Sequence, residues 1–294
     1  MPTELSKPKI AIVSLTCCEG CEFALLDLGQ KFLDLAKRVE IDNFRLIKEG
    51  GILPPRQARG QNDKGVRKDD KIYDISFIEG SVVTKRNLEV LKKIRKASKM
   101  LIVLGNCAQF GGIHKMKNWF GRYRALEKSY KNYKGIANPP IYPISEIVKV
   151  DFTIPTCPID GEEFLKIVYQ ILAGKKPQIP QNPVCFQCQI NGYECLLQNG
   201  EICLGPVTLG GCEAICLKSK QACWGCRGLL EEPDVDKFVM NCLLNAHPKK
   251  EIEKVLEVFG IKDDWLNQAQ KEWQSQRKPT ALMVVNRKKP IVKK

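Results

Sequence analysis

Histidine is scarce in this 294-residue chain, which has 2, at positions 114 and 247. The two lie far apart in sequence, and no Ser-His-Asp arrangement accompanies them. We therefore predict that each is a surface or packing residue. Any bound metal must then be held mostly by cysteine thiolates, because two histidines are too few to supply the ligands.

Several sequence signals of large function classes are also absent. The chain has no Walker A motif, no Gly-x-Gly-x-x-Gly motif and no internal repeat, so it lacks the common phosphate-binding loops. No apolar run approaches the ~18 residues of a membrane span. The first residues, MPTELSKPKI, lack an apolar stretch and a cleavage site, so we predict no export signal and a cytoplasmic location.

Cysteine, in contrast, is abundant, with 14 residues. In a reducing compartment disulfides are rare, and clustered cysteines indicate metal ligands. Thiolate ligands select zinc or iron–sulfur clusters. The cysteines therefore predict a thiolate-bound metal rather than a disulfide framework.

The chain is also basic, with a formal net charge of +14. Much of the positive charge lies at 56–71, 115–134 and 287–294, and the middle stretch interleaves aromatic and basic residues as stacking grooves for nucleic acids do. A solvated basic surface that docks acidic partners is the alternative. We favour the basic surface and predict no nucleic-acid partner, because no nucleic-acid-binding fold motif is present.

The first 160 residues alternate between strand and helix patterns. Short apolar runs predict strands at 9–15, 39–47, 73–80, 100–107 and 150–158. Amphipathic helices follow, one of them spanning Leu25 to Ala36, and Asp160 with Glu163 forms a capping-box pattern before another. This alternation predicts an α/β fold, a flavodoxin-like, doubly wound parallel sheet.

Polar and sulfur-bearing residues follow several of these strands. Cys17, Cys18 and Cys21 come after the first predicted strand, and Glu79 after the third. Cys107 ends the fourth and Cys157 follows the fifth. Ligands of doubly wound sheets gather at the carboxyl ends of the strands, so we expect these side chains at one edge.

The rest of the chain differs in composition. We predict three parts: a flavodoxin-like domain at 1–175, a Cys-rich irregular domain at 176–230, and helices with a basic tail at 231–294. The middle part is rich in Pro, Gly and Cys and lacks periodicity. Such a segment has little apolar face of its own, and metal binding can supply the missing folding free energy.

The middle part contains two groups of four cysteines. The first group is Cys185, Cys188, Cys195 and Cys203, and the second is Cys212, Cys216, Cys223 and Cys226. A single zinc site of Cys185, Cys188, Cys223 and Cys226 would leave four thiols without a role. Two 4Fe–4S clusters use all eight, and we favour them. Cys242 lies on an apolar helix face and is predicted to belong to the core.

The amino-terminal cysteines outnumber the places in one cluster. Five candidates compete for four positions, with Cys107 and Cys157 as single residues and Cys18 with Cys21 as a Cys-x-x-Cys pair. Cys17 can instead be a small buried apolar residue.

Four motifs occur in the order found in the small subunits of nickel–iron hydrogenases: SLTCCEGCEFALL, FIEGSV, GNCAQFGG and PTCPIDGEE. The chain resembles these subunits over roughly residues 8–230. The block from Cys185 to Gly228 resembles the cytoplasmic branch, with the sulfhydrogenase delta and methanogen hydrogenase gamma subunits. The resemblance implies an electron-transfer subunit without the catalytic nickel–iron centre, which a large partner subunit carries. It also implies a flavin or iron–sulfur subunit as electron acceptor.

By that resemblance three 4Fe–4S clusters are expected. Cys18, Cys21, Cys107 and Cys157 hold the proximal cluster, the second group of the middle part holds the medial one, and the first group holds the distal one. Glu19 and Glu79 are candidates for placing charge or relaying protons near the proximal cluster, although an ordinary polar role is equally open.

The adjacent pair Cys17–Cys18 also resembles the homologous 20-kDa subunit of respiratory complex I, in which neighbouring cysteines both bind the cluster. This leaves the choice among Cys17, Cys18 and Cys21 open. The complex I relative lacks the eight-cysteine block, so the hydrogenase interpretation is favoured. An iron–sulfur protein that binds nucleic acid is the second alternative.

Overall fold

The computed structural model describes residues 6–47, 72–119, 124–136 and 138–262. The chain divides into two compact units, Met1–Ile179 and Pro180–Lys294, and the predicted division into three parts stays a prediction. The basic stretches 56–71 and 287–294 lie outside the described residues. Within the described ranges, no helix is both long and apolar enough to cross a membrane.

The first unit is built on one five-stranded sheet in which every pairing is parallel. The strands are β1 (Lys9–Ser14), β2 (Glu40–Phe44), β3 (Tyr73–Glu79), β4 (Ser98–Leu104) and β5 (Phe152–Ile154). Their order, β2-β1-β3-β4-β5, is that of flavodoxin. The predicted flavodoxin-like, doubly wound parallel sheet is thus confirmed.

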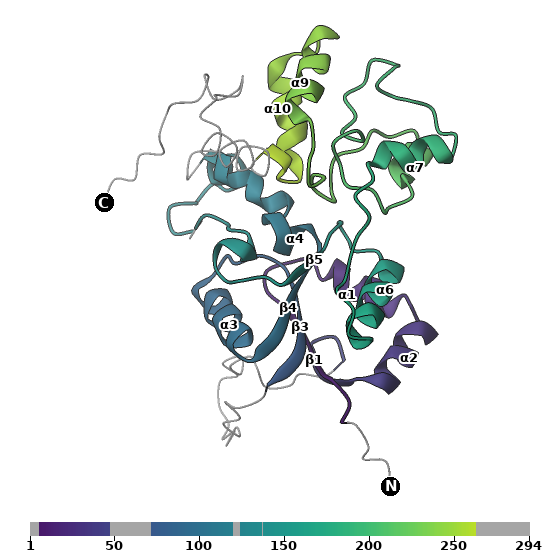
Figure 1. Ribbon diagram of the computed structural model, residues 1–294. Coiled ribbons are helices and arrows are strands. Elements are labelled where there is room, and N and C mark those ends of the chain that lie inside the picture. Colours follow the sequence, from purple (N-terminus) through teal and green to yellow (C-terminus); the bar gives the residue numbers. More distant parts are fainter. Residues whose placement is uncertain (1–5, 48–71, 120–123, 137, 263–294) are drawn as a thin grey trace, which may run out of the picture. The chain divides into compact units, whose positions relative to one another are not determined.

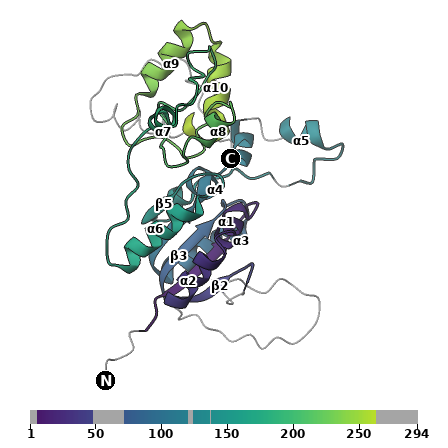
Figure 2. The same cartoon turned by 90° about the vertical axis from the view of Figure 1, so that its right-hand side faces the viewer.

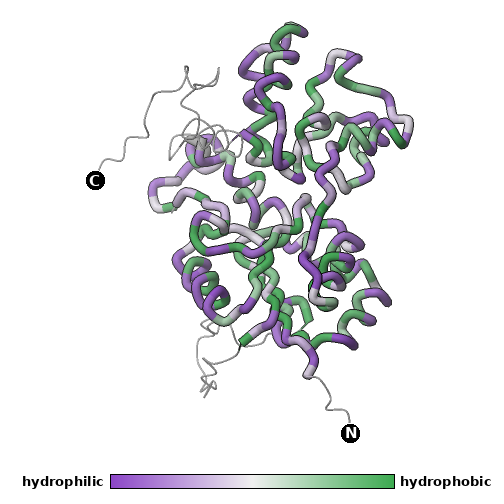
Figure 3. The backbone as a smooth tube through the Cα atoms, in the orientation of Figure 1, coloured by the Kyte–Doolittle hydropathy of each residue, from purple (hydrophilic) through white to green (hydrophobic). Residues whose placement is uncertain are grey.

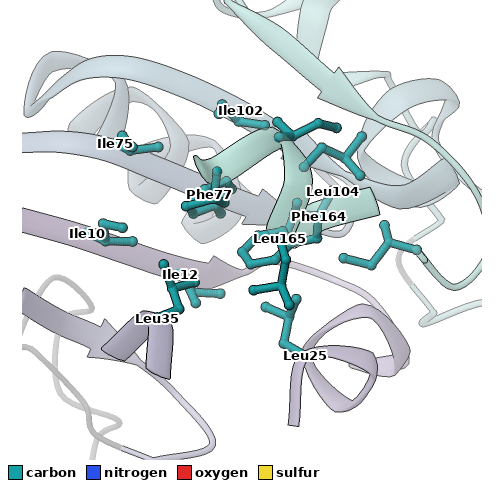
Figure 4. Packing of buried hydrophobic residues seen from close by; sticks show 14 of the residues in the cluster. Ile10, Ile12, Leu25, Leu35, Ile75, Phe77, Ile102, Leu104, Phe164 and Leu165 are labelled. Carbon is teal, nitrogen blue, oxygen red and sulfur yellow. The ribbon is translucent and has the colours of Figure 1, made fainter. Parts of the chain in front are cut away.

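Helices cover both faces of this sheet (Figures 1 and 2). One face packs against α1 (Gly20–Leu26), α2 (Gln30–Arg38) and α6 (Gly161–Leu172), and the other against α3 (Lys85–Lys96). Parallel strands buried on both faces need near-continuous apolar runs, and the strands lie in the hydrophobic range of Figure 3. Figure 4 shows Phe77 of β3 beside Phe164 of α6, with ring centroids 5.0 Å apart.

Predicted and observed elements differ in several places, and the strand expected at 150–158, for example, is limited to Phe152–Ile154. The single helix expected from Leu25 to Ala36 is two helices, because Gly29 adopts φ 53° and ψ −118° between them, a conformation that side chains with a Cβ rarely reach. The strand expected at 100–107 ends at Leu104, and Cys107 lies in the short helix α4 (Gly105–Phe110). Its thiol therefore projects from a helix beyond the strand, not from the strand end.

Side-chain caps define several helix starts. Thr84 and Asn87 form a reciprocal capping box at α3, and the Asp160 carboxylate accepts the Glu163 N–H at 2.7 Å at α6. The remaining elements of this unit are α5 (Arg124–Ser129) and the 3₁₀ helices Ile113–Trp119 and Ile144–Glu146. Caps of this kind fix where the chain leaves each strand loop for its helix.

The second unit has short helices joined by long loops. They are α7 (Val184–Ile190), α8 (Ile215–Lys218), α9 (Val235–Leu244) and α10 (Lys249–Val258). Its apolar core includes Cys188, Cys203, Cys223 and Cys242. The predicted core position of Cys242 is confirmed, since its exposed fraction is 3%. Three candidate ligand cysteines thus belong to the interior of a unit that has little regular structure.

Candidate metal centres

The loops at the carboxyl edge of the sheet are tied to one another in pairs. After β1 and β3, the Leu15 N–H donates to the Glu79 carbonyl at 2.8 Å and the Ser81 N–H to the Thr16 carbonyl at 3.0 Å. After β4 and β5, the Asn106 N–H donates to the Thr156 carbonyl at 2.9 Å. The loops that carry the amino-terminal cysteines therefore form a connected frame.

Within this frame the thiols of Cys18, Cys21, Cys107 and Cys157 influence one another. Burial, followed by the charges of Cys157, Cys18 and Glu79, raises the pKa of Cys107 to about 12. Burial raises the pKa of Cys21 most, with Glu79, Cys107 and Cys157 adding to it. Cys18 and Cys157 are exposed, whereas Cys21 is buried. These influences relate Cys107 to Cys18, Cys21 and Cys157 in turn, and the set reaches the surface at Cys18 and Cys157.

Cys17 faces a different set of neighbours. Its pKa is raised by burial and then by the charges of Glu79, Glu22 and Cys107. Its thiol hydrogen-bonds the Glu79 carboxylate. Neither Cys18 nor Cys157 contributes to its surroundings as they do for Cys107. Cys107 adds to the pKa of both Cys17 and Cys21, so the choice among Cys17, Cys18 and Cys21 stays a prediction.

Glycines leave space beside the sulfur atoms. A Cβ on Gly105 would lie 2.5 Å from the Cys21 Sγ, and one on Gly112 would lie 2.7 Å from the Cys107 Sγ. Both glycines have positive φ, +74° and +76°. A Cβ on Gly20 would lie 3.3 Å from the Cys18 Sγ. Side chains at these positions would fill the space beside these sulfurs.

Glu79 lies at the centre of the frame with an exposed fraction of 1%. Its Oε1 accepts the Cys21 N–H at 3.2 Å and its Oε2 accepts the Glu22 N–H at 3.0 Å. Burial raises the pKa of Glu79, and the two N–H groups oppose that shift. The carboxylate therefore holds the first turn of α1, and with it the Cys21 side chain.

Sequence reasoning missed Glu22, which is fully buried. The Ser14 hydroxyl donates to its Oε1, and its Oε2 is buried without a hydrogen-bond partner in the structure. Burial raises the pKa of Glu22 to about 7. An acidic residue directly after a candidate ligand cysteine was the available signal. The predicted Glu19 instead pairs with Arg45, with 3.0 Å between Oε1 and Nη1.

In the second unit, the first group of four cysteines forms one set of mutually interacting thiols. Burial, followed by the charges of Cys203, Cys188 and Cys195, raises the pKa of Cys185 to about 12. A Cβ on Gly205 would lie 3.0 Å from the Cys185 Sγ and 3.6 Å from the Cys203 Sγ. Gly205 thus lies beside two sulfurs, whereas each glycine of the first unit described above lies beside one.

The second group is linked to the first. After burial, the charge of Cys212 and then that of Cys203 raise the pKa of Cys216. The pKa of Cys223 is raised mainly by burial, with Cys203 and Cys226 adding to it. The Cys223 N–H donates to the Cys203 Sγ at 3.2 Å, and the Leu204 N–H to the Cys223 carbonyl at 2.9 Å. Cys203 is therefore the contact between the two groups.

The donor sets fit iron–sulfur clusters chemically. Every candidate is a thiol, and burial raises the pKa of each residue that shifts, so a cationic metal core would be the group that favours their thiolate form. Within the described residues, no three His, Cys, Asp or Glu side chains are already arranged around a single metal ion.

The chain is similar to several known proteins. The family model of the 20-kDa subunit of NADH–ubiquinone oxidoreductase matches residues 18–171. Sulfhydrogenase 2 subunit delta from Pyrococcus furiosus is 35% identical over 261 residues, which cover 86% of this chain and 99% of that one. The iron-sulfur subunit of the F420-non-reducing hydrogenase from Archaeoglobus profundus is 26% identical, covering 75% of this chain and 82% of the relative.

Among solved structures, the actinobacterial-type NiFe-hydrogenase from Ralstonia eutropha H16 is similar with a TM-score of 0.50. The sequence identity is 17%, and the match covers 93% of this chain and 92% of that one. At this identity the likeness concerns the fold alone. It agrees with the parallel sheet and its helices described above.

Proposed function

The chain belongs to the family of the 20-kDa subunit of NADH–ubiquinone oxidoreductase, together with delta and iron-sulfur subunits of hydrogenases, and on that premise we propose that it is the electron-transfer subunit of a nickel–iron hydrogenase. Its full-length similarity to a sulfhydrogenase delta subunit supports a place in a hydrogenase complex. The observation that carries the electron-transfer role is the gathering of thiols in two units, each with glycines beside the sulfurs.

In this proposal, Cys18, Cys21, Cys107 and Cys157 hold the proximal 4Fe–4S cluster. The choice of Cys18 over Cys17 is supported by the shared surroundings of Cys18, Cys107 and Cys157. A cluster at this place supplies one-electron transfer when bound. The chain contributes the frame of tied loops, and Glu79 holds the turn that carries Cys21.

The second unit carries the other two clusters. Cys212, Cys216, Cys223 and Cys226 hold the medial one, and Cys185, Cys188, Cys195 and Cys203 hold the distal one. The hydrogen bond from Cys223 to the Cys203 Sγ supports neighbouring clusters, because it joins one residue of each group. An iron–sulfur role is also in the name of the relative from Archaeoglobus profundus.

The partners follow from the same premise. A large subunit carries the nickel–iron centre, and the exposed thiols Cys18 and Cys157 mark the edge that faces it. A flavin or iron–sulfur subunit accepts the electrons. The complex works in the cytoplasm, and this chain is its non-catalytic part, with no role for a nucleic acid or a membrane span.

The first test is the metal content of the anaerobically purified complex. We expect about 12 irons on this chain, as three clusters require, and nickel in a larger co-purifying subunit. About 4 irons together with zinc, and no nickel, would contradict the proposal. The eight central cysteines would then form structural zinc sites.

A substitution tests the proximal cluster directly. Cys107→Ala should remove about 4 irons and abolish hydrogen-dependent dye reduction. Cys242→Ala is the matched control, since it removes a buried thiol from a helix core and should leave iron content unchanged. Cys17→Ser should be mild, and loss of one cluster there would show that Cys17 is the ligand.

A complex I-like respiratory subunit is the second candidate function, because the matching family model carries that name. The model matches residues 18–171 and ends before the eight central cysteines. Purification with quinone-reducing partners and with a single cluster would favour this alternative. Co-purification with nickel would exclude it.

A further inference from the structure

One polar pair at the carboxyl edge of the sheet has no role in the function proposed above. Ser81 lies in the loop that follows β3 and is fully buried. Its Oγ lies 2.6 Å from the His114 Nε2. The Ser81 backbone is fixed in turn, since its N–H donates to the Thr16 carbonyl at 3.0 Å and its carbonyl accepts the Thr16 N–H at 3.3 Å. The His114 ring is therefore anchored to the frame that carries the amino-terminal cysteines.

The other side of the ring lies beside Cys107. A Cβ built on Gly112 would be 2.7 Å from the Cys107 Sγ, 2.9 Å from the His114 Cε1 and 3.1 Å from the His114 Nδ1. The sulfur and the imidazole thus border the same small space. Gly111 and Gly112, with φ of +99° and +76°, turn the chain back so that position 114 returns to position 107.

The two ring nitrogens then have distinct surroundings. The Nε2 faces the Ser81 hydroxyl, and the Nδ1 belongs to the part of the ring that borders the Cys107 sulfur. The Ser81 hydroxyl can donate to or accept from Nε2, so the contact itself is compatible with either ring tautomer. A hydroxyl that donates to Nε2 leaves the proton on Nδ1.

We propose that His114 is a positioning residue for the proximal cluster: its Nδ1–H donates a hydrogen bond to the Cys107 sulfur, while the Ser81 hydroxyl donates to Nε2 and holds the ring in place. The inference rests on the proposed function, since it needs a cluster at Cys107. A thiolate bound to metal only accepts hydrogen bonds, so it selects the tautomer with Nδ1 protonated. Hydrogen bonds to cluster sulfurs favour the reduced, more negative state and raise the reduction potential.

The first test uses the unchanged sequence of the chain in its complex. Because the chain has 2 histidines, labelling histidine with ¹⁵N gives at most two labelled rings in this subunit. We expect the reduced proximal cluster to show a weak ¹⁵N coupling in pulsed EPR. The coupling should persist in His247→Leu and vanish in His114→Leu, which assigns it to one ring of this chain.

The second test is the potential of the same cluster in EPR-monitored redox titrations. In His114→Leu, the ratio of reduced to oxidised proximal cluster at a fixed ambient potential should fall about tenfold, a shift of about 59 mV for one electron. Ser81→Ala should shift it in the same direction but less. His114→Gln, which keeps an N–H donor, should recover part of the potential, and His247→Leu should not change it.

The outcomes separate the two proposals. A proximal cluster signal that disappears in Cys107→Ala but shows no ¹⁵N coupling in the wild-type chain would overturn the role of His114 alone. An unchanged potential in His114→Leu with a full iron content would do the same. Absence of any cluster that depends on Cys107 would overturn the proposed function and this inference together.

Discussion

At the residue scale, the candidate proximal site depends on glycines, because the missing Cβ leaves space beside the cysteine sulfurs. Gly105 and Gly112 leave room for the sulfurs of Cys21 and Cys107, and both adopt a φ that favours glycine. A cysteine pattern in a sequence identifies donors. The glycines beside the donors decide whether the sulfurs can approach one another.

Gly105→Ala is predicted to eliminate the proximal cluster, because the new Cβ would lie 2.5 Å from the Cys21 Sγ. Gly174→Ala is the matched control, since Gly174 has a similar φ of +71° and no atom within 4 Å of its Cβ position. Each variant should lose about 1 kcal/mol of stability from backbone strain. Iron analysis and EPR should show loss of about 4 irons in Gly105→Ala alone; equal iron in both would contradict the prediction.

Several site residues could be predicted from the sequence, and the rest depended on three-dimensional neighbours. The positions of Cys107, Cys157 and Glu79 after strands indicated a shared edge, as the tied loops show. His114 carried no local signal, because its proximity to Cys107 comes from the turn at Gly111 and Gly112. Glu22 was missed because an acidic residue on a short helix ordinarily faces solvent.

At the element scale, one acidic residue connects the edge strand β5 to its neighbour β4 and to α3. Asp151 lies just before β5, and its Oδ2 accepts the Leu101 N–H of β4 at 2.8 Å and the Arg95 Nη1 of α3 at 2.6 Å. Burial acts to raise the pKa of Asp151, but these two hydrogen bonds and the Arg95 charge outweigh it and lower the pKa. The ionised carboxylate therefore stabilises the pairing of β4 with β5.

Asp151→Asn should weaken the protection of amides in β4 and β5 by about 1.5 to 3 kcal/mol at neutral pH, the range for hydrogen bonds to charged groups. Because the folded pKa lies below the unfolded one, the wild-type advantage is present above about pH 3.9 and is lost as the pH falls through the folded value. Hydrogen–deuterium exchange from neutral to acid pH measures the difference. Asp34→Asn, at an exposed position of α2, should leave these strands unchanged.

The strands were more predictable than the breaks between elements. Apolar runs located β1 and β3 to within a residue or so, because strands buried on both faces must be apolar throughout. The division between α1 and α2 was missed, because a glycine in an amphipathic pattern is compatible with one continuous helix. Only its φ and ψ show that Gly29 ends the first helix.

At the scale of the whole molecule, the two units gain stability in different ways. The first has a five-stranded sheet with an apolar core on each face. The second has, within its described residues, helices of at most 10 residues and a core that includes several candidate ligand cysteines. Composition anticipated this contrast, since residues 176–230 combine many cysteines with little periodicity.

Removal of metal should therefore affect the units unequally. Anaerobic chelation of the oxidised complex should abolish amide protection across α7 and α8, because the thiols would lose the ions that hold the core together. Protection in β1, β3 and β4 should remain. Hydrogen–deuterium exchange before and after chelation measures both units in one sample, and persistent protection in α7 and α8 would show that the second unit folds without metal.

The hydrogen bond from the Cys223 N–H to the Cys203 sulfur has a consequence for biosynthesis under the proposed assignment. Filling one group of four fixes Cys203, and Cys203 in turn orients the chain at Cys223 in the other group. Delivery of the first cluster therefore lowers the ordering cost of the second. When iron is scarce, chains that hold both of these clusters should therefore outnumber those expected from independent filling of the two groups.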